Sequence, residues 1–154
     1  DETIFKGSNF IIVPTQKNKN ETVEAVKDLA TKMEFGRICT LSIEEHDKMI
    51  GFLSQLTHVI AVSLMNTHDN AHLVEYTGDS FRDLTRIAKI NEDLWTELFI
   101  MNKDILLDEI NQFIDSISHF RDSLEQEDTQ EMKRLFIQST KRRDKFNKTD
   151  AKKR

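Results

Sequence analysis

The hydrophobic pattern predicts one long helix between Ser42 and Thr67. Ser42 followed by Glu45 three residues later forms a capping box, which marks the start of a helix. From Met49 to Thr67 the sequence contains no Asp, Glu, Lys or Arg, although 32% of the chain is charged. Polar residues interrupt this segment, so we interpret it as the central helix of a helical core rather than a membrane span. They are Ser54, Gln55, Thr57, His58 and Ser63.

One face of this predicted helix is polar. At about 100° per residue, Asp47, Ser54 and His58 fall within a strip about 40° wide. The opposite side carries Met49, Phe52, Leu53, Leu56, Val59 and Ile60. A polar strip on an uncharged helix indicates the wall of an internal polar site. Because buried polar groups need partners but not ligands, a strip satisfied by neighbouring helices is the alternative.

The segment before Ser42 predicts a strand, a helix and a second strand. Residues 9–13 (NFIIV) are an apolar run that ends at Pro14, and residues 37–41 (RICTL) are another. Between them, residues 21–35 have helical periodicity, and Gly36 is expected to end that helix. Two strands need a larger sheet, so this piece is interpreted as the trailing part of an α/β domain whose main part is absent.

The rest of the chain predicts further helices. Ser80 is expected to cap a short helix over residues 81–89, and Asn91 to cap the next helix, which begins at Glu92. A later helix has apolar residues at alternating spacings of four and three, a seam that packs lengthwise on another helix. The seam consists of Leu106, Ile110, Phe113, Ile117, Phe120 and Leu124. Its spacing leaves open whether the partner helix is in the same chain or in a second copy. A last helix is expected from Thr129 to Lys145.

Composition supports a mainly α fold. The chain has four Gly and one Pro in 154 residues, few for a protein of many strands and turns. The net charge of −5 is uneven, because residues 141–154 are strongly basic. No aromatic-rich basic surface accompanies them, so a solvated helix end or linker is favoured over a nucleic-acid site. The single cysteine, Cys39, fits a reducing cytoplasm.

Arg86 and His58 are the main chemical candidates. Arg86 lies among apolar residues in LTRIA, and its planar guanidinium suits a carboxylate. An internal ion pair with Asp83 or Asp47 is an equal alternative. His58 is either a ligand-binding group or a satisfied core histidine. Trp95 is either a core residue or part of a pocket wall. We expect no metal site, and the sequence contains no G-x-G-x-x-G, P-loop or nucleophile elbow.

Taken together, these residues resemble the C-terminal region of prephenate dehydrogenases. The order is HD-x6-S-x3-H at residues 46–58, then FRDLTRIA at residues 81–88, then Trp95. The NFIIVPT segment resembles the last part of that family's nucleotide-binding domain. The resemblance covers about residues 5 to 140.

The resemblance implies an NAD-binding Rossmann-type domain followed by a helical domain that forms a homodimer. Such an enzyme oxidatively decarboxylates prephenate to 4-hydroxyphenylpyruvate in tyrosine biosynthesis. By the same resemblance, Arg86 binds the substrate carboxylate, and His58 and Ser54 line the pocket. Asp47, Arg82 and Trp95 match residues near the pocket entrance.

The departures from the family limit what this chain does by itself. The dinucleotide fingerprint and the family's catalytic histidine belong to the N-terminal domain and have no counterpart here, so no catalytic residue is assigned. The expected organisation is residues 1–41 as the trailing β-α-β piece, 42–147 as the helical dimerisation domain and 148–154 as a basic tail. The chain alone is expected to be inactive. An arogenate dehydrogenase and a non-catalytic helical interaction module are the alternatives.

Overall fold

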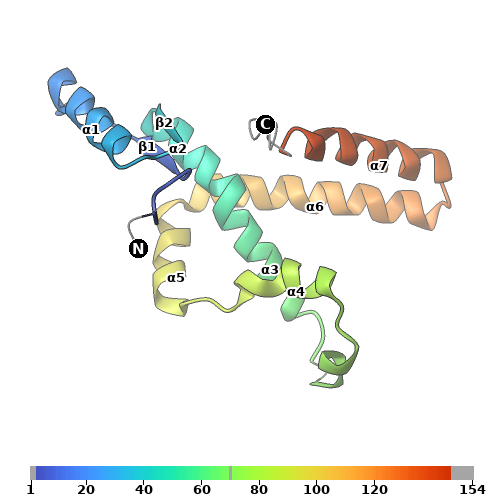
Figure 1. Cartoon of the computed structure of the whole chain (residues 1–154). Coiled ribbons are helices and arrows are strands. Elements are labelled where there is room, and N and C mark those ends of the chain that lie inside the picture. Colours follow the sequence, from blue (N-terminus) through green and yellow to red (C-terminus); the bar gives the residue numbers. More distant parts are fainter. Residues whose placement is uncertain (1–2, 70, 147–154) are drawn as a thin grey trace, which may run out of the picture. The chain divides into compact units, whose positions relative to one another are not determined.

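The computed structural model describes residues 3–69 and 71–146 and is mainly α-helical (Figure 1). It divides into two compact units, residues 1–109 and residues 110–154. Helix α6 (Lys103–Glu125) begins in the first unit and continues into the second. The predicted fold class, helices preceded by a short β-α-β piece, is confirmed. The predicted basic tail, residues 148–154, lies outside the described residues.

The β-α-β piece contains two parallel strands joined by a helix. Strand β1 (Asn9–Ile12) pairs with β2 (Arg37–Thr40) from Asn9 opposite Arg37 to Ile12 opposite Thr40. Helix α1 (Asn20–Lys32) connects them. The ring of Phe35 lies 4.8 Å from that of Phe10, which packs the end of the connection on β1.

The chain leaves α1 differently from the prediction. The helix ends at Lys32 rather than Phe35, and Glu34 takes the left-handed conformation with a φ of 61°. Gly36 therefore does not act as the left-handed helix stop. A Cβ atom at Gly36 would lie 2.8 Å from the Cα of Gly7, so the glycine permits two backbone segments to pass closely.

The central helix is continuous but has three parts. They are α2 (Ile43–Ile50), the π-helical segment η1 (Gly51–Leu56) and α3 (Thr57–Met65). The capping box is confirmed, because Ser42 Oγ accepts the Glu45 N–H at 3.1 Å and Glu45 Oε2 accepts the Ser42 N–H at 2.8 Å. The π segment was not predicted. A π turn holds more residues than an α turn, so angles computed at about 100° per residue do not hold across it.

Close packing accompanies the π segment. Gly51 is buried where α6 approaches, and a Cβ atom there would lie 2.8 Å from Cγ2 of Ile105. Gln55 and Leu56 are also buried, whereas Phe52 and Leu53 each expose more than half of their surface. By length and composition alone, Ile43–Met65 is apolar enough to cross a membrane, and 22% of its most apolar window is buried in this chain. As the central helix of a helical core, this segment was expected to bury its apolar face. Within one chain, part of that face is exposed.

Along the chain, the remaining elements of the first unit lie between α3 and α6. They are the 3₁₀ turn η2 (Ala71–Tyr76), α4 (Asp79–Thr85), the 3₁₀ turn η3 (Arg86–Ala88) and α5 (Glu92–Met101). The α3 helix packs against α4 and η3. Asn91 caps α5 as predicted, since its Oδ1 accepts the Leu94 N–H at 2.9 Å. The prediction for Ser80 is wrong, because α4 begins at Asp79, two residues before the predicted start, and its N-cap is Gly78.

The second unit is a helical hairpin of α6 and α7 (Thr129–Asp144). The rings of Phe120 and Phe136 lie 6.0 Å apart between the two helices. The seam is only partly covered: Leu106 is buried in the first unit, whereas Ile117 and Leu124 are more than half exposed. The second unit therefore leaves apolar side chains of the seam on its surface.

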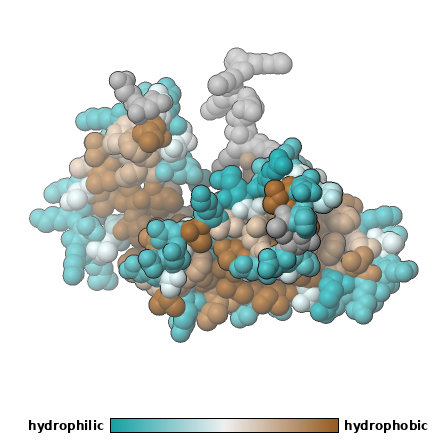
Figure 2. All heavy atoms as spheres, turned by 90° about the horizontal axis from the view of Figure 1, so that it is seen from below, coloured by the Kyte–Doolittle hydropathy of each residue, from teal (hydrophilic) through white to brown (hydrophobic). Residues whose placement is uncertain are grey.

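Apolar side chains also remain on the surface elsewhere in the chain. In the described ranges, the buried apolar side chains are those of Ala30, Leu56, Ala61 and Leu106, and two of these are alanines. Figure 2 shows apolar residues, in brown, gathered on the face seen from below. A chain of this length that packs alone normally buries a larger core. The described part of the chain therefore leaves much of its apolar side-chain surface exposed.

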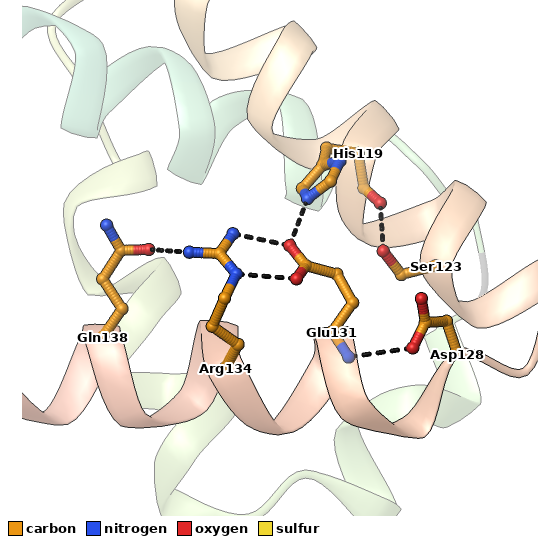
Figure 3. Close-up of polar contacts among 6 residues, drawn as sticks. All are labelled: His119, Ser123, Asp128, Glu131, Arg134 and Gln138. Atoms are coloured by element: carbon orange, nitrogen blue, oxygen red, sulfur yellow. Dashed lines mark hydrogen bonds and ion pairs between the residues drawn. The ribbon is translucent and has the colours of Figure 1, made fainter.

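A polar network links the two helices of the hairpin (Figure 3). Nε2 of His119 on α6 lies 2.7 Å from the Glu131 carboxylate on α7, and Arg134 Nε donates to the same carboxylate at 2.6 Å. The Asp128 side chain caps α7 by accepting the Glu131 N–H at 2.9 Å. Hydrogen bonds from Arg134 and then from His119 lower the pKa of the Glu131 carboxyl from 4.5 to about 2.

We expect Glu131→Gln to make the stability of the fold depend less on pH in acid. A carboxyl whose pKa is lowered by folding stabilises the fold fully above its unfolded pKa, and this contribution is lost as the pH falls toward the folded value. That window runs from about pH 4.5 to about pH 2. Thermal unfolding should show the wild type more stable near neutral pH, and the difference from the variant should shrink below about pH 4.5. A difference that stays constant with pH would contradict this assignment.

Candidate functional site

The π segment orients His58. Nδ1 of His58 lies 2.8 Å from the carbonyl oxygen of Ser54, which also accepts the Thr57 hydroxyl at 2.6 Å. A carbonyl oxygen only accepts hydrogen bonds, so Nδ1 carries the proton. Nε2 has no partner in the part of the chain that the structure describes. Nε2 is thus the ring atom available to a ligand.

Trp95 fixes the plane of the imidazole. The rings of His58 and Trp95 stack with centroids 3.7 Å apart and planes 29° apart. The ring of Phe99 also meets the indole edge-on, with centroids 5.5 Å apart. Both stacked residues are half-buried.

An amide pair beside this stack was missed by the sequence analysis. Gln55 is only 3% exposed, and its Nε2 donates to the Leu98 carbonyl at 3.0 Å. Nδ2 of Asn102 donates to Gln55 Oε1 at 2.8 Å and to the Asp47 carbonyl at 3.1 Å. The only signal in the sequence was an amide side chain within an uncharged helix. The partners lie more than 40 residues away, which no local pattern reveals.

Asp47 lies apart from the His58 stack. Its carboxylate is within 2.9 Å of Nδ1 of His46, and its side chain is partly exposed. Among the described residues, no interaction links Asp47 with Ser54 or His58. Within the described ranges, the hydrogen bonds that lead from Asp47 toward the stack run from its backbone carbonyl through the Asn102–Gln55 pair.

Arg86 is exposed rather than buried. It begins η3, which packs against the helix that carries His58. The predicted alternative, an ion pair with Asp83 or Asp47, does not occur in the described ranges. Arg86 makes no other hydrogen bond there, so its guanidinium is available to an anion. Arg82 lies one turn earlier, also exposed, 3.9 Å from Asp79.

The arrangement therefore brings together Ser54, His58 and Trp95 by direct contact and leaves two exposed arginines on the neighbouring segment. Cationic donors of this kind suit an anionic ligand that carries carboxylates. Within residues 3–69 and 71–146, no group of three or more His, Cys, Asp or Glu side chains is placed to hold a metal ion.

Known proteins are similar to this chain in sequence and in fold. The family model for the dimerization domain of prephenate dehydrogenase matches residues 42–138. The prephenate dehydrogenase of Bacillus subtilis is 33% identical over 140 residues, which are 88% of this chain and 38% of that protein. The cyclohexadienyl dehydrogenase of Zymomonas mobilis is 27% identical over 146 residues, 91% of this chain and 50% of that protein.

A solved structure agrees with the sequence relatives. The prephenate dehydrogenase from Aquifex aeolicus, in complex with hydroxyphenyl propionate and NAD⁺, superposes with a TM-score of 0.81 at 27% identity. The match covers 92% of this chain and 51% of that one.

The fold and its relatives define the helical C-terminal region of a dehydrogenase. The chain belongs to the prephenate dehydrogenase family, and residues 42–138 are its dimerization domain. It spans between 38% and 51% of the length of these relatives.

Proposed function

We propose that this chain is the substrate-binding and dimerising part of an enzyme that oxidatively decarboxylates prephenate to 4-hydroxyphenylpyruvate in tyrosine biosynthesis. One observation carries the proposal: His58 is fixed through Nδ1 and stacked on Trp95, while Arg86 on the adjoining segment has no partner among the described residues. The sequence resemblance and the names of the relatives support the same reaction.

The proposed roles follow from the charge of the substrate. Prephenate is a dicarboxylate, so the Arg86 guanidinium binds one carboxylate bidentately, and His58 donates from Nε2 when protonated. Ser54 lines the same pocket, and Asp47, Arg82 and Trp95 lie toward its entrance. Because loss of CO₂ makes the ring aromatic, the protein has mainly to orient the substrate and exclude water. No residue of this chain is assigned to proton removal from the ring hydroxyl.

The residues present do not fit the pyrophosphate of NAD. The turn after β1, residues 13–19, contains no glycine, and a dinucleotide cradle needs glycine for close backbone approach. An open hollow of about 650 Å³ lies beyond the carboxyl ends of the strands, lined by residues of this turn and by Ser42, Ile43 and Glu44. We therefore propose that NAD, the hydride acceptor, is bound mainly by a preceding nucleotide-binding domain.

We also propose that two copies associate through the helical domain. What supports this is the matched dimerization domain together with the exposed apolar residues of the central helix and of the seam. The same apolar surface on Ile43–Met65 is then covered by protein rather than by a membrane. A cytoplasmic enzyme without a nucleic-acid partner is the expected setting.

Turnover by the complete protein tests the proposal. NADH formation should be followed with prephenate and, in separate assays, with arogenate, the amino analogue. We expect turnover of prephenate by the complete protein and none by the isolated 154-residue chain. Turnover of arogenate alone would correct the substrate. Failure of well-folded complete protein to use either would leave the non-catalytic helical module, and NADH formation by the isolated chain would overturn the division of roles.

A further inference from the structure

Two contacts join the central helix to α5, one helical turn apart on both helices. His58 stacks on Trp95, and Gln55, three residues before His58, donates to the carbonyl of Leu98, three residues after Trp95. The two helices therefore meet along matched faces. A shift of α5 that broke the Gln55 contact would also displace the indole from the imidazole.

Asn102 completes this second contact. Its Nδ2 donates both to Gln55 Oε1 and to the carbonyl of Asp47, which lies in α2 just before the π segment. A side-chain donor that enters the backbone hydrogen-bond ladder is a recognised cause of a local change in helix geometry. The Gln55–Asn102 pair thus connects the π segment to the end of α5.

We propose that Gln55 and Asn102 are positioning residues for substrate binding. Together they hold the π segment and the register of α5, and so set the direction in which Nε2 of His58 points. Neither residue needs to touch substrate. The inference rests on the proposed function, and it assigns the specificity of the pocket partly to two amides outside it.

Because Gln55 is buried, its amide depends on hydrogen-bond partners from the protein. At 3% exposure the amide cannot exchange its partners for water, so both its donor and its acceptor must be matched within the protein. An apolar side chain of similar size would leave the Leu98 carbonyl and one Asn102 hydrogen unpaired. The helices would then adjust to satisfy those groups, and the stack would move with them.

The test compares three variants of the complete protein. Gln55→Met removes both hydrogen bonds at nearly constant volume. Gln55→Glu restores them only when its carboxyl is neutral, because the protonated acid donates to Leu98 and accepts from Asn102. Ser123→Ala is the matched control: Ser123 is also a buried polar residue, at 6% exposure, but its hydroxyl bonds only within α6 to the His119 carbonyl.

We expect Gln55→Met to lower kcat/KM for prephenate on the order of 10- to 100-fold, because small displacements of a binding group are costly. The KM for NAD should stay within about twofold, since the displaced groups face the other substrate. In Gln55→Glu the prephenate KM, relative to wild type at each pH, should be near normal in acid and rise with pH. A buried carboxyl has a raised pKa, which keeps the acid form populated at the low end. Ser123→Ala should leave both KM values unchanged.

Fluorescence of Trp95 provides a readout that does not depend on turnover. Indole emission depends on the groups that contact the ring, and His58 stacks on Trp95. The Trp95 emission, taken as the difference from Trp95→Phe, should therefore change in Gln55→Met and match the wild type in Ser123→Ala. An unchanged prephenate KM and an unchanged Trp95 emission in Gln55→Met, or a pH-independent KM ratio in Gln55→Glu, would overturn the positioning role. If the wild type turns over neither substrate, the proposed function fails, and the fluorescence result alone decides whether the amides hold the stack.

Discussion

Arg86→Ala in the complete protein is expected to raise the KM for prephenate by about 10- to 150-fold. A charge-assisted hydrogen bond of this kind contributes roughly 1.5–3 kcal/mol to binding. The thermal stability should change little, because Arg86 is exposed and has no ion pair in the part of the chain that is described. Exposed substitutions of this sort usually stay within about 0.5 kcal/mol. Steady-state kinetics with prephenate, together with a melting curve of the same preparation, measures both quantities.

Lys89→Ala is the matched control for Arg86. Lys89 follows η3 directly, is exposed, and carries the same charge. Its removal tests whether a dianionic substrate responds merely to net charge near the site, an effect that salt screens. We expect a KM within about twofold of the wild type, as for an unpaired surface charge. A large loss of stability in Arg86→Ala with unchanged KM would instead identify Arg86 as a structural residue.

Ile117→Lys is expected to convert the dimer to monomers. Ile117 is 54% exposed on the seam of α6, where a second copy would cover it. Burial of an isoleucine contributes about 1.5–3 kcal/mol, and a two-fold interface buries each such residue twice. The dissociation constant should therefore rise by about 100-fold or more. Sedimentation velocity over a concentration series measures this change.

Asn111→Lys separates loss of an apolar contact from the effect of an added charge. Asn111 lies on the same helix, is exposed, and gains the same charge on substitution. We expect this variant to sediment as the wild type does. A stable interface associates at tens of micromolar protein or below. If the wild type is monomeric at that concentration, the dimer proposal fails.

The elements whose ends are fixed by neighbouring residues were predictable. The capping box at Ser42 and the cap at Asn91 each join residues three apart, so the sequence contains both partners of the bond. The two short strands were equally clear, because apolar runs ended at Pro14 and at the start of the next helix. Where the local signal was weaker the prediction was wrong: Gly78 rather than Ser80 precedes α4, and Glu34 rather than Gly36 turns the chain out of α1.

The sequence analysis named the candidate site residues but did not predict their geometry. The sequence placed Ser54 and His58 on one helix and set Arg86 and Trp95 apart as notable, and the structure joins His58 to Trp95 and to the Ser54 carbonyl. The sequence did not predict that Ser54 contacts His58 through its backbone carbonyl. The π segment changes the angular relation of Asp47 to both residues, so the predicted strip does not describe the observed contacts.

By itself, then, the sequence determined the helices, the small β-α-β piece and the family resemblance, because these depend on short-range periodicity, capping and spacing. Only the tertiary structure decided the π segment, the exposure of Arg86 and the amide contacts of Gln55. The Gln55 contacts are made with Asn102 and Leu98, which lie more than 40 residues from Gln55 along the chain. Hydrogen bonds between groups so far apart are set by how helices pack, and helix packing is decided by the whole fold rather than by any local segment.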